Sequence, residues 1–243
     1  VRGIKHITYD DPYLTYDDQG KACFVSSFIG EALGQLAAWN VMVANDFSHR
    51  PVAGVVSCAC MYRPAYVGET LLLESFIDCL DDSAVQYHSI ARIADEVVFT
   101  IDGALGPLMP MQEFIDPIEI RRQFKEIDRP GDWPSPPAQA ECLMPKTALP
   151  GFPLLFDRVI SSEAGVALSA EKRITRAASY FPDHFPNKPV LPLTVLLECK
   201  INLAHEFIAR AGFTQQFQTT ALRKIKMSDF VYPRSEEHTS ELQ

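Results

Sequence analysis

This chain of 243 residues lacks long apolar runs, cysteine pairs with CxxC spacing and an excess of basic residues. No apolar run approaches the roughly 20 residues of a membrane-spanning helix, and no charged and apolar leader opens the sequence, so a membrane span is not expected. None of the six cysteines has CxxC spacing, which argues against metal ribbons and redox motifs. We therefore expect buried, reduced thiols in a cytoplasmic protein.

The charge balance is acidic, with 22 lysines and arginines against 31 acidic residues and a net charge of −9. A nucleic-acid binder usually carries a basic field, so that class is not expected. Hydrophobic residues make up 47% of the chain, enough for one large core or two smaller ones.

The last ten residues, 234–243, read RSEEHTSELQ and show no periodicity. They resemble the translation of a sequencing-library adapter, so we expect them to be extraneous to the protein and disordered. The alternative is a short acidic tail.

A weak internal repeat divides the chain. With an offset of 167 positions, Lys5–Thr8 falls on Lys172–Thr175, and the apolar stretch Phe28–Val43 overlays Val195–Ala209. Between the copies, a short charged helix candidate at 118–127 precedes a proline-rich stretch that cannot sustain a helix or a central strand. We expect a first domain at 1–114, a linker at 115–150 and a second domain at 151–233.

Each copy predicts one long helix beside several strands. In the first copy the helix runs from about Phe28 to Ala44, and because it is apolar on most faces it should be buried. Strand-like runs follow at 52–63, 70–80, 84–94 and 97–103, with a tight turn at Asp95-Glu96. The second copy predicts strands at 153–160 and 166–176, a helix from Leu193 to about Ala211 and a strand at about 216–230.

These patterns predict an α+β fold with two antiparallel sheets, each wrapped around a long central helix. The repeat indicates that the first copy lacks an opening strand and that the second copy is truncated, so we expect exposed sheet edges.

The segment Phe181–Pro192, FPDHFPNKPVLP, resembles the signature of the 3-hydroxyacyl-[acyl-carrier-protein] dehydratase family. That motif places an acidic residue fourteen positions after the histidine, which here are Glu198 and His184. Residues 149–159 look like the opening strand of the family, and Glu31–Gln35 is similar to its Glu-Ala-x-x-Gln helix motif. The family has the hotdog fold, so the resemblance implies a fused double hotdog that uses no metal or organic cofactor.

The family forms its sites from the histidine of one hotdog and the helix carboxylate of the other. Carried over, His184 would be the base and Glu31 the acid, with Gln35 orienting that carboxyl group or a water, and the backbone N–H of Leu193 would polarise the thioester carbonyl. An imidazole that titrates near neutrality suits proton removal at C2, and a carboxylic acid suits loss of the C3 hydroxyl. Asp17 stands where the reciprocal histidine would be, so the second site would be degenerate.

The remaining site residues follow from the same resemblance. Glu198 would partner Asn202 or an internal water as a relic of the second site, and Phe185 and Pro192 would line an acyl tunnel. Asn187 and Leu193 replace glycines of the family pattern. Leucine keeps the N–H group but adds a side chain beside the thioester.

The resemblance implies a hydro-lyase that converts (3R)-3-hydroxyacyl thioesters on acyl carrier protein into trans-2-enoyl thioesters. Acyl carrier protein or an acyl-coenzyme A thioester is the implied partner, and a homodimer of double hotdogs stays open. The alternatives are a non-catalytic acyl-binding scaffold and, less favoured, a hotdog thioesterase. Basic islands at 121–122 and 223–226 would suit an acidic carrier, with ordinary solvated faces as the alternative.

Overall fold

The computed structural model describes residues 1–129, 131, 156–215, 217–233 and 240–242, and the chain forms two compact units. The first unit comprises Val1–Phe152 and Thr220–Ser228, and the second comprises Pro153–Thr219 and Asp229–Gln243. The chain therefore returns to the first unit after forming most of the second.

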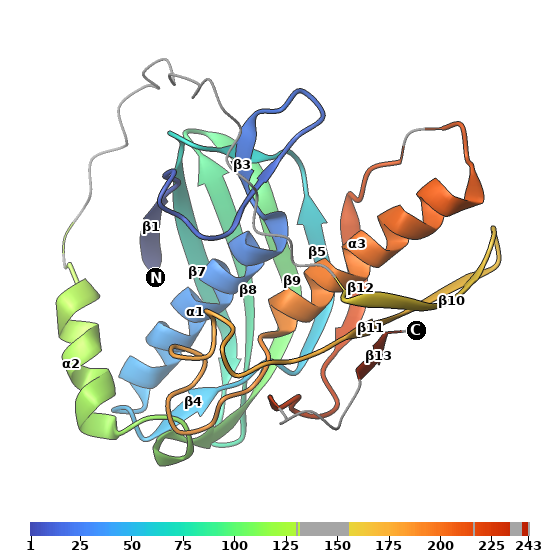
Figure 1. Ribbon diagram of the computed structural model, residues 1–243. Coiled ribbons are helices and arrows are strands. Elements are labelled where there is room, and N and C mark those ends of the chain that lie inside the picture. The colour runs from blue at the N-terminus through green and yellow to red at the C-terminus, as the bar shows by residue number, and fades with distance from the viewer. Residues whose placement is uncertain (130, 132–155, 216, 234–239, 243) are drawn as a thin grey trace. The chain divides into compact units, whose positions relative to one another are not determined.

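The 19-residue helix α1 (Ser26–Ala44) lies across one face of the main sheet of the first unit (Figure 1). Ile29, Leu33 and Val41 have no exposed surface. Because apolar side chains cover most faces of this helix, it is stable only when it is enclosed. The enclosing face comes from three long strands, β7 (Thr70–Leu80), β8 (Ala84–Ile93) and β9 (Glu96–Pro110).

The main sheet of the first unit has seven antiparallel strands in the order β1-β7-β8-β9-β5-β12, and the short strand β4 pairs with the far end of β9. The further strands are β1 (Arg2–His6), β4 (His49–Pro51), β5 (Val55–Met61) and β12 (Ala221–Lys226). A separate three-stranded sheet joins β2 (Leu14–Tyr16), β3 (Ala22–Phe24) and β6 (Ala65–Tyr66).

A β-bulge at Gly103 adjusts the register of β9 against β8. Tyr87 pairs with Ala104 and Ser89 with Ile101, so β9 carries one extra residue at this point. Gly103 has a φ angle of 60°, and a Cβ atom there would lie 2.6 Å from Ser57 Oγ. Glycine meets both requirements because it tolerates positive φ and has no side chain.

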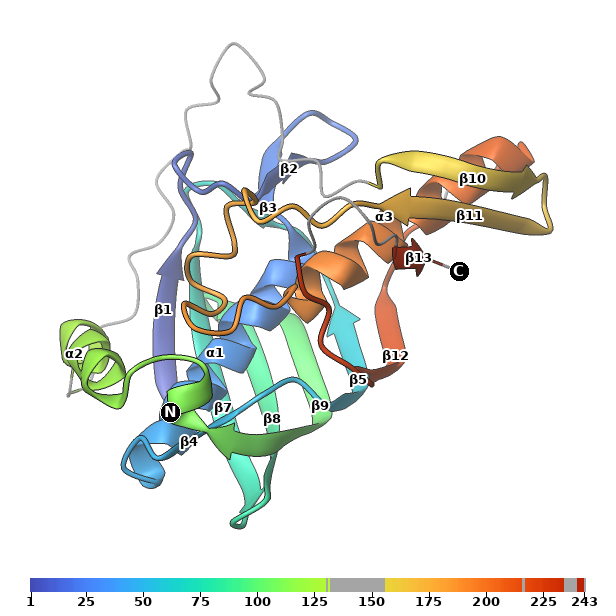
Figure 2. The same cartoon turned by 60° about the horizontal axis from the view of Figure 1, so that its bottom comes forward.

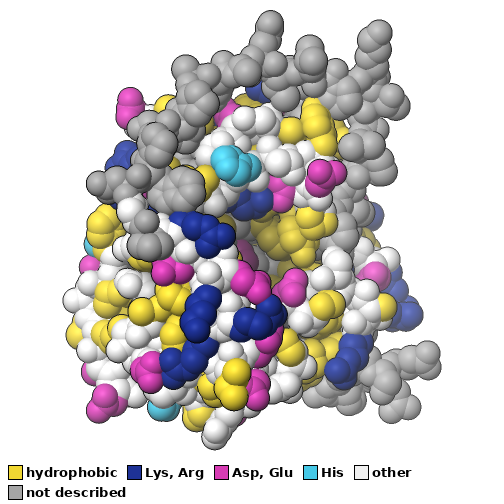
Figure 3. All heavy atoms as spheres, turned by 90° about the vertical axis from the view of Figure 1, so that its left-hand side faces the viewer, with side chains coloured by type: hydrophobic (Ala, Val, Ile, Leu, Met, Phe, Trp, Pro, Cys, Tyr) yellow, Lys and Arg dark blue, Asp and Glu magenta, His cyan; other side chains and the backbone are white. Residues whose placement is uncertain are grey.

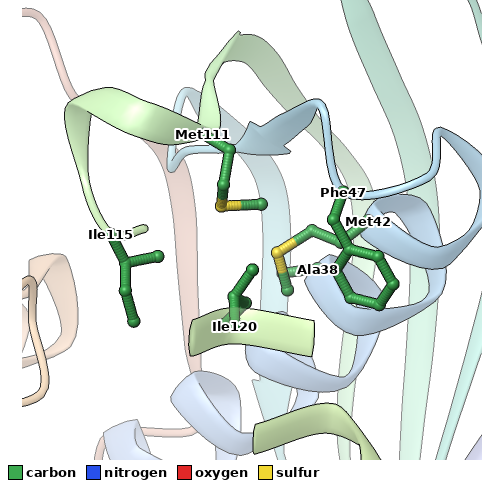
Figure 4. Packing of buried hydrophobic residues seen from close by; sticks show 6 residues of the cluster. All are labelled: Ala38, Met42, Phe47, Met111, Ile115 and Ile120. Carbon is green, nitrogen blue, oxygen red and sulfur yellow. The ribbon is translucent and has the colours of Figure 1, made fainter. Parts of the chain in front are cut away.

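Helix α2 (Pro117–Ile127) packs on the first unit through a buried apolar cluster. Asp116 caps the helix by accepting a hydrogen bond of 2.7 Å from the Ile118 amide. The cluster gathers side chains from α1, α2 and the turns between them, namely Ala38, Met42, Phe47, Met111, Ile115 and Ile120 (Figure 4). The prediction that residues 115–150 form a linker is therefore wrong for this helix, because its apolar face belongs to the core of the first unit.

The second unit contains a β-hairpin and a long helix (Figure 2). The hairpin joins β10 (Arg158–Glu163) to β11 (Ala167–Lys172), and α3 (Leu193–Ala211) contacts β11. Helix α3 begins and ends 167 residues after α1, at 193 against 26 and at 211 against 44. The two helices thus match the repeat at both ends.

A buried carboxylate stabilises the hairpin of the second unit. The Glu171 side chain is only 1% exposed and lies between Arg158 and Arg173, with 2.9 Å from its Oε1 atom to Arg173 Nε. The hydrogen bond from Arg173 lowers the pKa of the Glu171 carboxyl, against the opposing effect of burial and with a further contribution from Arg158.

The predicted fold class, α+β with an antiparallel sheet around a long central helix, is confirmed. Strand β7 has the predicted bounds, and β8 and α3 agree within one residue. The tight turn is shifted to Ala94-Asp95, because Ile93 pairs with Glu96 and Ala94 has a φ angle of 51°.

The structure corrects two expectations near the C-terminus. The strand expected at 216–230 is the shorter β12, and it pairs with β5 of the first unit. Residues Ser240–Leu242 form β13 on β11, so the expected disorder is wrong for these three residues, whose backbone groups bond to an available strand edge. The proline-rich stretch at 132–137 lies outside the described residues.

The expectation of uniformly buried cysteines is also wrong. Cys23 and Cys199 are buried, Cys58 and Cys60 are half-buried, and Cys79 is exposed. Cys58 and Cys60 are exposed to this degree because they lie on the face of β5 opposite the buried Ala59. Cys142 lies outside the described residues.

We predict that Ile120→Ala destabilises the protein by about 2–4 kcal/mol, because it opens a cavity under α2. Ile118→Ala on the same helix is the matched control, since Ile118 is 79% exposed, and its effect should stay within about 0.5 kcal/mol. Urea denaturation of both variants measures the difference. Equal free energies of unfolding would show that α2 does not belong to the core.

Candidate functional site

His184 lies in a loop that is held by backbone hydrogen bonds of the second unit. The His184 amide donates to Tyr180 O at 3.1 Å, and the Val190 amide donates to His184 O at 3.1 Å. Phe185 and Lys188 exchange two further amide–carbonyl bonds of 3.2 Å each. The histidine is thus fixed at the base of a tight turn between two proline-flanked segments.

The ring of His184 has a defined tautomer. Its Nδ1 atom lies 2.9 Å from the carbonyl oxygen of Val190. A carbonyl oxygen only accepts, so Nδ1 carries the proton, and in the neutral imidazole the lone pair is at Nε2. The residue therefore has the proton arrangement of a general base that acts through Nε2.

Phe185 and Pro192 flank this histidine in the sequence and are both buried. The Phe185 ring stacks on the imidazole with 4.1 Å between ring centroids. Pro192 is the residue before the first turn of α3. Stacking restricts the rotation of the imidazole, whereas a role for either residue in an acyl tunnel stays a prediction.

Leu193 is the first residue of α3, and an amide at this position has no partner within its helix. The adjacent turn amides, Val195 and Leu196, already bond to Pro192 O. The Leu193 N–H therefore lies at the positive end of the helix dipole, as expected for a carbonyl-polarising group. Neither Leu193 nor Asn187 has a positive φ angle, so replacing the family glycines causes no left-handed strain at these positions.

Glu198 and Asn202 lie one turn apart on α3 and are both half-buried. Residues four apart in a helix share a face, so these two side chains lie on the same side of α3, and their partnership stays a prediction. Between them, Cys199 is buried, and burial raises the pKa of its thiol to about 11, with the charges of Glu198 and Asp157 acting in the same direction. This thiol is therefore protonated at neutral pH.

Glu31 and Gln35 are brought together on α1 of the first unit. Gln35 Nε2 donates a hydrogen bond of 2.8 Å to Glu31 Oε1. This is the orientation expected for a glutamine one turn after the functional carboxylate. Glu31 and His184 belong to different units, so their joint use stays a prediction.

The structure adds a buried arginine and a half-buried tyrosine to the surroundings of Glu31, neither of which the sequence analysis singled out. Arg50 is only 5% exposed, and burial lowers its pKa to about 10 while the charge of Glu31 opposes that change. Burial, together with the charge of Glu31, raises the pKa of Tyr87 to about 12. In the sequence, the only indication for Arg50 was an arginine next to an apolar segment. This pattern is too common to identify a site residue.

Asp17, at the position of the missing histidine, has a structural role. Its carboxylate accepts hydrogen bonds from the amides of Gln19 and Lys21 and from the Tyr66 hydroxyl, at 2.8 to 2.9 Å. Burial alone would raise the pKa of Asp17, but the bonds from Lys21, Tyr66 and Gln19 outweigh it and lower that pKa. The carboxylate joins the turn after β2 to β6.

The two basic islands differ in their pairing. Arg121 binds Asp46 at 2.6 Å, and Arg122 binds Glu119 at 2.7 Å and also Glu126. Basic and acidic side chains accordingly lie next to one another on the face that carries α2 (Figure 3). In β12, the exposed Arg223, Lys224 and Lys226 form no ion pair with another described residue.

Within the described ranges, no group of three or more His, Cys, Asp and Glu side chains is arranged to hold a metal ion. None of the described helices has the length and apolar character needed to cross a membrane.

The sheet wrapped around α1 has the arrangement of the hotdog fold, and the segment of His184 resembles the histidine motif of the dehydratases. Residues 149–242 match the family model described as a FabA-like domain. The resemblance to the 3-hydroxyacyl-[acyl-carrier-protein] dehydratases is thus confirmed over the C-terminal part of the chain.

Curated proteins named 3-hydroxyacyl-[acyl-carrier-protein] dehydratase FabZ match this chain over short segments. The 3-hydroxyacyl-[acyl-carrier-protein] dehydratase FabZ of Anaeromyxobacter sp. (strain Fw109-5) is 49% identical over 45 residues, covering 18% of this chain and 28% of the relative. FabZ of Oleidesulfovibrio alaskensis is 27% identical over 84 residues, covering 33% and 54%. The chain therefore spans less than two thirds of the length of these relatives.

Solved structures give weaker matches. An acyl-ACP thioesterase from Bacteroides thetaiotaomicron has a TM-score of 0.35 and 8% identity, with 46% of each chain covered. A hypothetical protein from Thermus thermophilus has a TM-score of 0.35 and 12% identity, covering 52% of this chain and 98% of the other. Similarity at this level carries no argument about function.

We predict that Asp17→Asn lowers the free energy of unfolding by roughly 1 kcal/mol near neutral pH, because three hydrogen bonds to a charged carboxylate are weakened. The pKa of Asp17 is lowered in the folded state, so its contribution is present above the unfolded pKa and is lost as the pH falls through the folded pKa. Denaturation from about pH 7 to about pH 3 should show the gap between wild type and variant closing.

The exposed neighbour Asp18 supplies the matched control, Asp18→Asn, which should have little effect at any pH. A gap that is as wide at the acidic end as at neutrality would contradict the role of the Asp17 charge.

Proposed function

We propose that this protein is a hydro-lyase that removes water from (3R)-3-hydroxyacyl thioesters and forms trans-2-enoyl thioesters. The observation that carries the proposal is the 2.9 Å contact between His184 Nδ1 and Val190 O, which leaves the Nε2 lone pair as the proton acceptor. The match of residues 149–242 to a FabA-like domain supports the same reaction class.

In the proposed reaction, His184 Nε2 takes the proton from C2 of the substrate. That carbon is acidified by the neighbouring thioester carbonyl, whose developing negative charge would be stabilised by the amide at the start of α3. The electron pair of the C2–H bond forms the C2–C3 double bond, and the hydroxyl group leaves C3. The leaving oxygen takes a proton from a carboxylic acid and departs as water.

The proposed acid is Glu31, supported by its bond from Gln35, which fixes one carboxyl oxygen. Glu198 is the competing carboxylate, since it occupies the corresponding position of the second helix, 167 residues later. Proton transfer from His184 back to the acid would restore the starting state, so no metal or organic cofactor is required.

A non-catalytic acyl-binding protein is the second candidate, and the observation in its favour is Leu193. Its half-buried side chain begins α3 at the position where the family pattern has glycine. In that case the thioester would bind near the helix start without being aligned for proton transfer.

We predict that His184→Asn lowers kcat by at least about 100-fold, because it removes the base. Asparagine places its amide nitrogen where Nδ1 stands, so the bond to Val190 O and the loop should persist. Mass-spectrometric detection of enoyl product from a (3R)-3-hydroxyacyl-pantetheine thioester measures turnover, and circular dichroism checks the fold. His205→Asn, at an exposed histidine of α3, is the matched control and should keep full activity.

Two parallel variants, Glu31→Gln and Glu198→Gln, test which carboxyl group donates the proton to the leaving hydroxyl group. The proposal requires that Glu31→Gln abolishes turnover while Glu198→Gln retains most of it. Binding of the thioester by the folded wild-type chain without any enoyl product would overturn the dehydratase proposal and establish the acyl-binding protein instead.

The proposed form of the substrate is a thioester on acyl carrier protein, with β12 as the docking strand. Three exposed cations without described ion pairs favour an acidic partner, whereas Arg121 and Arg122 of α2 are already paired with carboxylates.

We predict that Lys224→Glu raises KM for the carrier-bound thioester several-fold and leaves kcat unchanged, since rim charges act mainly on association. The pantetheine thioester, which has no carrier, supplies the control and should keep its KM. Loss of affinity for both substrates would argue against docking at β12.

A further inference from the structure

Cys58 and Cys60 form a dithiol on the surface of the first unit. They occupy alternate positions of β5, so both side chains point to the same face of the sheet, opposite to that of the buried Ala59. Their sulfur atoms are 3.4 Å apart, and both thiols are free and half-buried.

The neighbouring strands place charged groups beside this pair. In the sheet register, Arg223 of β12 and Asp102 of β9 lie directly opposite Cys58 on either side. The hydrogen bond with Cys60 raises the pKa of the Cys58 thiol, and burial adds to this, while the charge of Arg223 acts against it. The arginine thus partly offsets the rise in this pKa and so opposes the loss of the thiolate that exchange chemistry requires.

The other described cysteines lack these features. Burial raises the pKa of Cys23 to about 11 and that of Cys199 to about 11, so both thiols stay protonated and shielded. Cys79 is exposed but has no described cysteine in contact with it. Only the pair on β5 combines access with a second thiol within the described part of the chain.

We infer that Cys58 and Cys60 are a redox-active dithiol that exchanges with a low-molecular-weight disulfide, such as glutathione disulfide, and closes to an internal disulfide. In the first step a cysteine thiolate attacks one sulfur of the small disulfide, and one glutathione leaves as its thiolate. In the second step the other cysteine attacks the mixed disulfide and expels the second glutathione. The two cysteines lose two protons and two electrons, and the small disulfide gains both.

Closure of this disulfide changes the strand. Alternate Cα atoms of an extended strand are about 6.6 Å apart, near the upper limit of disulfide geometry, whose usual value is about 5.5–6 Å. Strand β5 must therefore shorten locally between Cys58 and Cys60. Strand β12 pairs with this stretch and is an edge strand, so its hydrogen bonds yield before those of β9. Oxidation accordingly weakens the backbone pairing of β12, residues 221–226, with β5.

The test uses the full chain with Cys79→Ser and Cys142→Ser, incubated with glutathione disulfide and analysed by intact mass and peptide mapping. We expect a product lighter by two hydrogen atoms, with the link mapped to Cys58 and Cys60, and reversal by dithiothreitol. Cys60→Ser should instead retain one glutathione on Cys58. The exchange rate should rise about tenfold per pH unit below the thiol pKa, as thiolate forms.

Hydrogen exchange of the backbone amides tests whether oxidation loosens β12. Amides of β12 should exchange faster after oxidation, whereas amides of β7 and β8 should not change. Stable glutathione adducts on both cysteines of the wild-type pair, or no reaction with the disulfide, would overturn the dithiol. If the Cys58–Cys60 disulfide forms but the β12 amides exchange at an unchanged rate, the inferred effect of oxidation on the edge strand is wrong.

Discussion

The burial of α1 is the constraint on which the rest of the first unit depends. A helix with apolar side chains around most of its surface must be covered on most sides, and the long strands β7, β8 and β9 cover one of them. Helix α2 covers the C-terminal half through Met42 and Ile120. The few polar groups of α1 then have to be satisfied within the enclosure, which is why Gln35 bonds to Glu31. The same constraint that forms the core therefore orients the carboxylate of the proposed site.

The second unit positions its histidine in a different way. The loop of His184 depends on backbone hydrogen bonds, so its geometry is insensitive to many side chains around it. This explains how Asn187 and Leu193 stand in place of glycine without positive φ angles. The carbonyl of Val190, rather than a carboxylate, selects the tautomer of the ring. The position of the imidazole thus depends on the course of the main chain between Pro182 and Pro192.

The sequence predicted those features that local patterns determine. Helix periodicity and the repeat placed α1 and α3, and alternation placed β7 and β8. Partners distant in the sequence were not predictable: α2 has a helical pattern, but nothing in it identifies Met42 and Met111 as the side chains it covers. Likewise β12 reads as a strand of the second copy, and only tertiary pairing joins it to β5. Of the site, His184 was found through its motif, whereas the burial of Arg50 could not be predicted, because an arginine next to an apolar segment is too common a pattern.

The return of the chain to the first unit at β12 has a consequence for synthesis on the ribosome. More than half of the chain lies between β5 and β12, so the main sheet emerges and folds long before its last strand exists. During that interval the outer edge of β5 has unpaired backbone groups that could join another nascent chain. Closing so long a loop is also slow, since non-local pairs form late. A chaperone that binds extended edges would therefore find its target in nascent chains and not in the finished protein.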